Sequence, residues 1–226
     1  RPDGGFAYGG TIISNGDIGY QARLPKDRLN HTGTNHGSIE CINGQWYVFY
    51  HRLTHNSDYS RQACAEPITI LPDGSIPQVE MTSCGMNGGP LRGGTYPAVI
   101  CCNLTTGHMS HSSNQKKKTA EPCVTSGNGE RYITGITDGT VIGYKYFVLS
   151  GKGTLTIVTR GDEGIFAVAL GDQEIEIPVL SSPGWTEYKA EFMVPMGIFP
   201  VFLTFQGKGK AEMKEIRIGG GDGWNS

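Results

Sequence analysis

The strongest strand pattern in the first third of the chain lies between Gln45 and Arg52. Successive side chains of a strand point to opposite faces, and both alternating faces of this segment carry bulky apolar or aromatic groups. We therefore expect a strand that is buried on both sides, with Trp46 in the core. Residues 41–44 predict a turn and residues 38–41 a preceding strand, so the two strands would form a hairpin. His36 would lie just before the first strand of that hairpin.

The second half of the chain shows a steady alternation of apolar and polar positions. Short alternating runs are each bounded by Gly, Pro, Asp or Ser, and turn-like sequences lie at residues 161–164 and 170–172. Several short strands at intervals of about 8–12 residues predict a β-sandwich. The predicted strands are residues 155–158, 165–170, 174–177, 188–194, 201–205 and 215–218.

Between these two regions, residues 80–97 are rich in Gly, Pro and Asn and predict an irregular connector. We place a domain boundary there, which gives an N-terminal part of residues 1–95, a sandwich of residues 96–219 and a flexible tail of residues 220–226. The polar stretch 108–119 predicts a solvated loop.

Composition supports an all-β chain and excludes some classes of function. Glycine supplies 34 of 226 residues, about twice its usual share of roughly 7%, and runs of good helix formers are missing. The formal net charge is −2, which gives no support to nucleic-acid binding. No apolar run approaches the roughly 20 residues of a membrane span, and we recognise no signal peptide. The chain opens at Arg1 without a Met, so we expect a processed product or a fragment.

The six cysteines do not indicate a compartment. They show no C-x-x-C spacing, so we expect buried free thiols in strands rather than a metal site or a disulfide framework. They are Cys41, Cys64, Cys84, Cys101, Cys102 and Cys123.

The N-terminal motifs resemble a known family. Asn35-His36-Gly37-Ser38, followed by residues 44–52 and by Ser60-Arg61, resembles the last blade of the five-bladed β-propeller of family 43 glycoside hydrolases, and residues 2–13 resemble the approach to that blade. The resemblance covers roughly the first ninety residues. It implies one or more blades of a partial propeller, a partner in the remainder of the propeller, and a parent enzyme acting on arabinose- or xylose-containing plant polysaccharide.

The second half is similar to the jelly-roll-like β-sandwich of family 6 carbohydrate-binding modules, which often follow family 43 catalytic domains. Tyr132, and Trp185 within Ser182-Pro183-Gly184-Trp185-Thr186, match the stacking pair of that family, which implies that they bind sugar. The alternative is that Trp185 caps the core and Tyr132 is an ordinary strand residue. An asparagine that hydrogen-bonds sugar in the family appears here as Ala211 or Glu212, and the acidic calcium-binding strand is replaced by residues 99–104.

Catalysis and metal binding are separate questions. An inverting glycosidase needs two carboxylates on opposite sides of the sugar, and the family's three catalytic carboxylates lie on blades that this chain lacks. We therefore assign no catalytic residue and expect Glu40 and Glu66 to be solvated or ion-paired.

The resemblance places His36 at the propeller axis, where some relatives bind calcium directly or through water. Calcium prefers six to eight oxygen ligands, so a hydrogen-bonded structural histidine is the alternative.

Three hypotheses follow. The chain is the C-terminal part of an inverting glycosidase with an appended sugar-binding sandwich, an independent carbohydrate-binding module, or a purely structural sandwich that binds no sugar.

Overall fold

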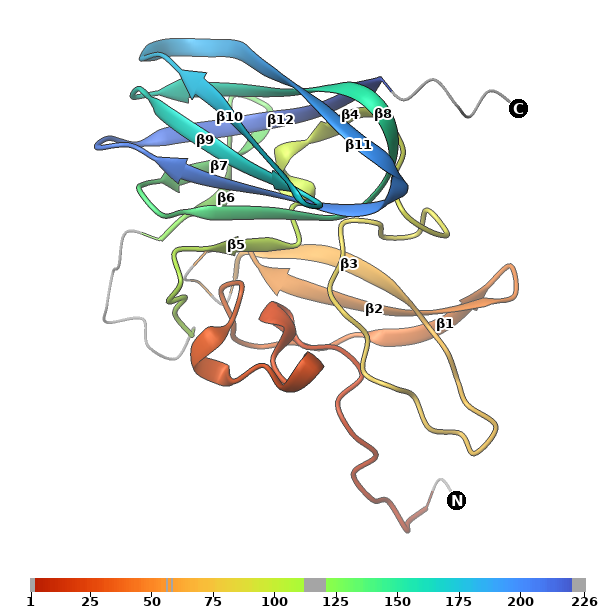
Figure 1. Cartoon of the computed structure of the whole chain (residues 1–226). Coiled ribbons are helices and arrows are strands. Elements are labelled where there is room, and N and C mark those ends of the chain that lie inside the picture. Colours follow the sequence, from red (N-terminus) through yellow and green to blue (C-terminus); the bar gives the residue numbers. More distant parts are fainter. Residues whose placement is uncertain (1–2, 56, 58, 112–120, 221–226) are drawn as a thin grey trace.

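Two antiparallel sheets follow one another along the chain (Figure 1). The structure is a computed structural model that describes residues 3–55, 57, 59–111 and 121–220. The N-terminal sheet has three strands in the order β1-β2-β3, and the second sheet has nine strands and folds into a sandwich. The predicted all-β fold, with part of a propeller blade before a jelly-roll-like sandwich, is confirmed. None of the helices in the described residues is long and apolar enough to cross a membrane.

The small sheet is a meander that follows three short 3-10 turns. The turns are η1 (Asn15–Asp17), η2 (Tyr20–Ala22) and η3 (Pro25–Asp27), and the strands are β1 (Ser38–Ile42), β2 (Gln45–Leu53) and β3 (Arg61–Ile68). The predicted hairpin is present. Its two-residue turn has φ of 50° at Asn43 and 82° at Gly44, and positive φ at both central residues is what a type I′ hairpin turn requires.

The prediction that Trp46 is buried is wrong. Val48 and Tyr50 on the same face are buried, but Trp46 is 40% exposed. Trp46 pairs with Cys41 on one side and with Ile68 on the other, so it lies beside the hairpin turn, at the end of the sheet that projects from the molecule (Figure 1). A run of aromatic residues shows that a strand is bulky, but it does not show how far the covering layer extends.

The large sheet contains nine strands and one 3-10 turn. They are β4 (Gly94–Pro97), η4 (Ala98–Ile100), β5 (Asn103–Thr105), β6 (Cys123–Gly127), β7 (Glu130–Ile136), β8 (Val141–Gly161), β9 (Gly164–Leu170), β10 (Gln173–Val179), β11 (Ser182–Gln206) and β12 (Ala211–Gly220).

Two long strands turn this sheet into a two-layer sandwich. β8 and β11 pair along most of their length, and each curves from one layer into the other (Figure 1). One layer is β10-β9, the second half of β11, the first half of β8, and β5. The other is the first half of β11, the second half of β8, then β12 with β7, β4 and β6. The strands predicted separately at 188–194 and 201–205 are therefore two parts of β11, because bulges between Val194 and Val201 keep the strand continuous through its bend.

The core fills the space between the two layers. Along each alternating strand, every second side chain is apolar and points into this core. Its largest fully buried members are Tyr144, Phe147, Phe166, Phe205, Ile133, Ile136, Ile142, Leu155, Ile157, Leu170 and Ile177.

Other predictions have mixed outcomes. Residues 99–104, which stand where the related family has an acidic opening strand, include the end of η4 and the start of β5. All six cysteines are free, and Cys84, Cys101 and Cys102 are buried as expected, whereas Cys41 is exposed.

Most of the predicted loop at 108–119, and the tail from residue 221, lie outside the described residues. The boundary near residue 95 stays a prediction, and the small sheet ends at Ile68 while the large one begins at Gly94.

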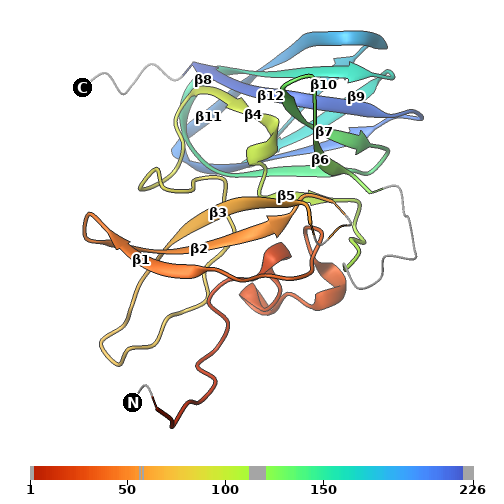
Figure 2. The ribbon, with the colours of Figure 1, turned by 180° about the vertical axis from the view of Figure 1, so that it is seen from behind.

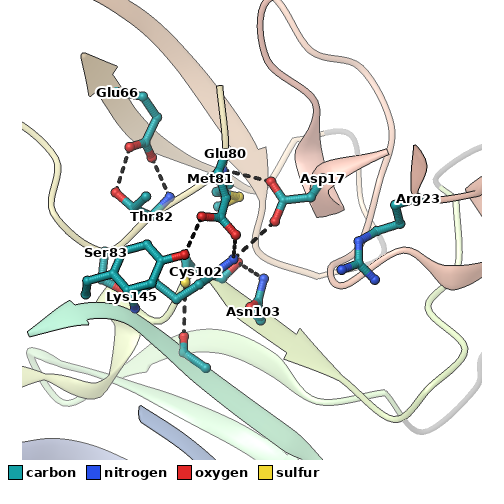
Figure 3. A network of polar contacts seen from close by, with 12 residues as sticks. Asp17, Arg23, Glu66, Glu80, Met81, Thr82, Ser83, Cys102, Asn103 and Lys145 are labelled. Carbon is teal, nitrogen blue, oxygen red and sulfur yellow. Dashed lines mark hydrogen bonds and ion pairs between the residues drawn. The ribbon is translucent and has the colours of Figure 1, made fainter. Parts of the chain in front are cut away.

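A buried polar network joins the small sheet and its connectors to the sandwich (Figure 3). Lys145 Nζ of β8 lies 2.6 Å from a Glu80 oxygen and 3.3 Å from Asp17 Oδ2, and Tyr146 donates a hydrogen bond of 2.6 Å to the other Glu80 oxygen. Burial raises the pKa of Asp17, although the Lys145 charge opposes the rise.

A buried arginine makes a second connection. Arg52 of β2 donates to the carbonyl oxygens of Val99 and Cys101, and to Gln62. Backbone bonds add to these contacts, among them Val124 N to Thr54 O at 2.9 Å. The two parts lie directly against each other when seen from the front and from behind (Figures 1 and 2). Their relative position is therefore fixed by hydrogen bonds that leave few buried polar groups unpaired.

Candidate functional site

The matched aromatic pair comes together on the outer face of the sandwich. The ring centroids of Tyr132 and Trp185 are 5.4 Å apart, with an interplanar angle of 68°. Both side chains are half-buried. Their register explains this orientation: Ile133, next to Tyr132, points into the core, so Tyr132 points outward.

The sandwich holds Trp185 above its strands. Trp185 belongs to β11 and Tyr132 to β7, and β8 and β12 lie between these strands. The two rings meet only because their side chains reach over β8 and β12. Arg160 of β8 and Lys214 of β12 rise from those strands, with the Arg160 guanidinium carbon 4.3 Å and Lys214 Nζ 5.2 Å from the centre of the Trp185 ring. Two cations therefore lie within cation–π distance of the indole.

Hydrogen bonds and ion pairs fix the ring further. The indole Nε1 donates to Glu130 at 2.8 Å, and Lys214 Nζ lies 3.0 Å from the other Glu130 oxygen. These bonds from Lys214 and then Trp185 lower the pKa of the Glu130 carboxyl. Arg160 Nε donates to Glu212 at 2.5 Å, which raises the pKa of the guanidinium. Glu130 is therefore ionised at neutral pH, and the indole cannot rotate without losing a charge-assisted bond.

Residues 182–186, which carry Trp185, form the start of β11. The pairing register with β8 shifts between Ser182 and Thr186, which is a bulge that leaves Pro183, Gly184 and Trp185 outside the ladder. The Ser182 hydroxyl donates to Gly184 O at 2.9 Å and closes this bulge.

The family's hydrogen-bonding asparagine has no equivalent at the two positions considered. Ala211 is buried and has no polar side chain. Glu212 accepts hydrogen bonds from Arg160 and, at 2.6 Å, from the Thr134 hydroxyl. A bound sugar would therefore depend on Trp185 and on the polar groups around it.

His36 lies two residues before β1, as predicted. Its ring contacts His51 edge-on, with centroids 4.6 Å apart, and His51 Nε2 is 2.7 Å from Thr34 O. Gly37 is required here, because a Cβ at this position would lie 1.7 Å from Phe49 O. The Asn-His-Gly-Ser motif thus allows the loop to pass close to β2.

The surroundings of His36 do not by themselves fit a calcium ion. In the part of the chain that the structure describes, no group of three or more His, Cys, Asp or Glu side chains could hold a metal. The lining of the cavity beside His36 includes Tyr8, Asn35 and Ser38, but no carboxylate. Calcium needs six to eight oxygen ligands, so His36 as a calcium ligand stays a prediction that requires ligands from elsewhere.

Glu66 differs from its expected role. It is 1% exposed rather than solvated, and it accepts hydrogen bonds from Tyr50, from Thr82 N and from the Thr82 hydroxyl at 3.2, 2.7 and 2.6 Å. Burial raises its pKa to about 7, against the effect of these bonds. Glu40, in contrast, is exposed as expected.

Glu130, Arg160 and Lys214 were not singled out from the sequence. Each occupies an outward position of an alternating strand, which is the usual place for a solvated charge. Only the pairing of β7, β12 and β8 brings them under one indole.

Comparisons with known proteins agree with this fold. No protein-family model matches the chain. A xylosidase/arabinosidase of Thermoclostridium stercorarium is 41% identical over 232 residues, covering 96% of this chain and 49% of that protein. The chain thus spans about half the length of this relative.

One solved structure has a similar fold, and a second is a weaker match. A glycoside hydrolase family 43 arabinoxylan arabinofuranohydrolase from Bacillus subtilis, solved with cellotetraose, has a TM-score of 0.52 at 19% identity and covers 97% of this chain and 46% of that one. A CBM6 of Clostridium stercorarium, solved with cellobiose, has a TM-score of 0.47 at 16% identity over 58% of this chain and 98% of that one. In sequence, this chain is a homologue of a xylosidase/arabinosidase, of which it spans about half, and in fold it is similar to a family 43 arabinoxylan arabinofuranohydrolase.

Proposed function

We propose that this chain is the sugar-binding part of a glycoside hydrolase that acts on arabinose- or xylose-containing plant polysaccharide, and that Trp185 is the surface on which the sugar stacks. The observation that carries the proposal is the immobilised indole. Glu130 bonds its Nε1, and Arg160, Lys214 and Tyr132 contact its ring.

Sugar binding is physically reasonable at such a ring. The C–H face of a pyranose or furanose is apolar and packs on an aromatic face, while its hydroxyls need hydrogen-bonding groups around that face. Glu130 and Glu212 provide acceptors beside the ring. Because the indole is already fixed, binding costs little side-chain entropy. The edge-to-face contact of Tyr132 leaves no gap for a sugar between the rings, so the sugar stacks on the outward face of Trp185, with Tyr132 as support.

The relatives support plant polysaccharide as the ligand. The 41% identical protein is named a xylosidase/arabinosidase, and the enzyme that shares the fold is named an arabinoxylan arabinofuranohydrolase. We propose that the same parent activity applies here and that hydrolysis takes place outside these 226 residues.

The small sheet fits a role as a contact surface for the remainder of a propeller. Its three strands leave β1 at one edge, and Phe6 and Tyr8, which precede it, are 81% and 85% exposed. Unpaired sheet edges with apolar neighbours are usually covered by another element. We propose that the rest of the parent enzyme covers this edge.

Affinity electrophoresis on arabinoxylan tests the proposed sugar binding. The chain should be retarded, and Trp185→Ala should remove the retardation without changing the far-ultraviolet circular dichroism. Trp46→Ala is the matched control and should bind like the parent, because Trp46 lies on the small sheet. A folded Trp185→Ala protein with unchanged retardation would favour the purely structural sandwich.

A further inference from the structure

We propose that the ligand is an extended chain of several sugars, which runs from Trp185 across β7 and round the edge strand β6 into a cleft between the sandwich and the small sheet. This inference rests on the proposed function and adds the second part of the binding site. The cleft has a volume of about 570 Å³ and lies where β6 and β7 face the segment after β2. Its polar lining includes His55, Tyr59 and Ser60 on one side and Thr125, Ser126 and Arg131 on the other.

The path from the indole to the cleft follows the strand pairing. Tyr132 pairs with Thr125 of β6, and both point outward because their neighbours Ile133 and Val124 are buried. The step from Trp185 to Tyr132 is 5.4 Å between ring centres, and the step from β7 to β6 adds about 4.8 Å. Thr125 is also part of the lining of the cleft, whereas its neighbour Ser126 and the paired Arg131 point to the opposite face of the hairpin by the same alternation. β6 is the last strand in the order of the sheet, so the path turns round the edge of β6 to reach them. This path is longer than one sugar ring, and only a chain can contact both ends.

The walls of the cleft are fixed relative to each other. Val124 N donates to Thr54 O at 2.9 Å directly beside it, and the buried contacts of Lys145 with Asp17 and Glu80 hold the same two parts together elsewhere (Figure 3). A composite site of this kind therefore exists before the ligand arrives and does not have to close around it.

The cleft carries groups that suit a sugar chain. Tyr59 is 95% exposed and offers an aromatic face. His55 is held at both nitrogens, with Nδ1 3.2 Å from the Thr54 hydroxyl and Nε2 2.7 Å from the Ser60 hydroxyl. The exposed guanidinium of Arg131 supplies several donors. A second aromatic face with nearby donors repeats the chemistry of Trp185 at the other end of the path.

Calorimetric titration of the whole chain with xylobiose and xylohexaose tests this inference. The hexasaccharide should bind about tenfold or more tightly than the disaccharide. The double variant Tyr59→Ala, Arg131→Ala should lose that gain, so that both ligands bind with similar affinity. Tyr8→Ala and Lys152→Ala remove an exposed tyrosine and an exposed cation outside the cleft and should keep the gain.

Two results would overturn the inference, and they differ in what they say about Trp185. If the double variant keeps the full length dependence while Trp185→Ala abolishes binding, the extended path is wrong and the proposed sugar site stands. If neither xylo-oligosaccharide nor arabinoxylan binds the unmodified chain, both are wrong. Thermal unfolding of every variant separates loss of binding from loss of fold.

Discussion

Trp185 donates its indole hydrogen to Glu130 across three strand spacings of the sandwich, from β11 to β7, at 2.8 Å. The two residues are 55 positions apart in the chain. Their bond keeps the indole beside Arg160, and without this bond the ring could rotate into solvent.

Glu130→Ala should therefore weaken sugar binding without unfolding the protein. Glu130→Gln should bind better than Glu130→Ala, because its amide oxygen still accepts the indole hydrogen although Lys214 loses its ionic partner. The alanine variant should bind severalfold more weakly, because it loses a charge-assisted bond that solvent only partly replaces. Calorimetry with xylohexaose measures the difference, and equal affinities for the two variants would show that the indole needs no fixing.

Lys145→Met should destabilise the whole molecule. It leaves Asp17 and Glu80 without the cation that neutralises them, and breaking a buried ion pair costs about 3–5 kcal/mol. Lys152→Met is a matched control on the same strand, since its pair with Glu191 is exposed and such pairs contribute about 0–1 kcal/mol. Urea unfolding measures both, and a similar small effect for the two variants would contradict a joining role for the network.

Glu66→Gln should change how stability depends on pH. A carboxyl whose folded pKa is raised to about 7 favours the folded state when protonated, so its contribution is complete below the ordinary glutamate pKa of 4.5 and is lost as pH rises through 7. The loss amounts to roughly 3 kcal/mol. Glutamine resembles the protonated form and can still hydrogen-bond Tyr50 and Thr82. The variant should thus gain stability over the parent between pH 5 and 8 in urea unfolding, and a constant difference over that range would disprove the raised pKa.

The isolated chain should hydrolyse no glycoside. Glu66 is buried and bonded to Thr82, and Glu40 is exposed on β1, so these two carboxylates do not flank a common sugar site as an inverting mechanism needs. Assays of chain 1–226 with aryl arabinofuranoside and xyloside should give no turnover. Turnover that disappears in Glu40→Gln would identify a catalytic acid that we have not assigned.

Local signals predicted the strands of this fold well. Alternation and turn residues located β9, β10 and β12, and Asn43-Gly44 fixed the small hairpin. The long β11 was predicted as two shorter strands, because a bend inside a continuous strand resembles a turn in sequence, and of the long β8 only residues 155–158 were predicted. Burial of Trp46 was mispredicted, because it depends on where the covering layer ends.

The candidate site could be predicted only in part. The resemblance pointed to Tyr132 and Trp185, but the charged residues beneath the indole come together through the pairing of four strands. Glu66 is the same kind of case. Its burial depends on Thr82, sixteen residues away in an irregular segment, and no periodic pattern describes such a contact.

Sugar binding at Trp185 is measured most directly by the indole N–H signals in a ¹H–¹⁵N spectrum of the ¹⁵N-labelled chain. The chain has three tryptophans, Trp46, Trp185 and Trp224, and substituting each by phenylalanine assigns its signal. Titration with xylohexaose should shift the Trp185 signal in a saturable way and leave that of Trp46 in place. A Trp185 signal that stays unmoved at saturating ligand, or a shift confined to Trp46, would contradict sugar binding on this face of the sandwich.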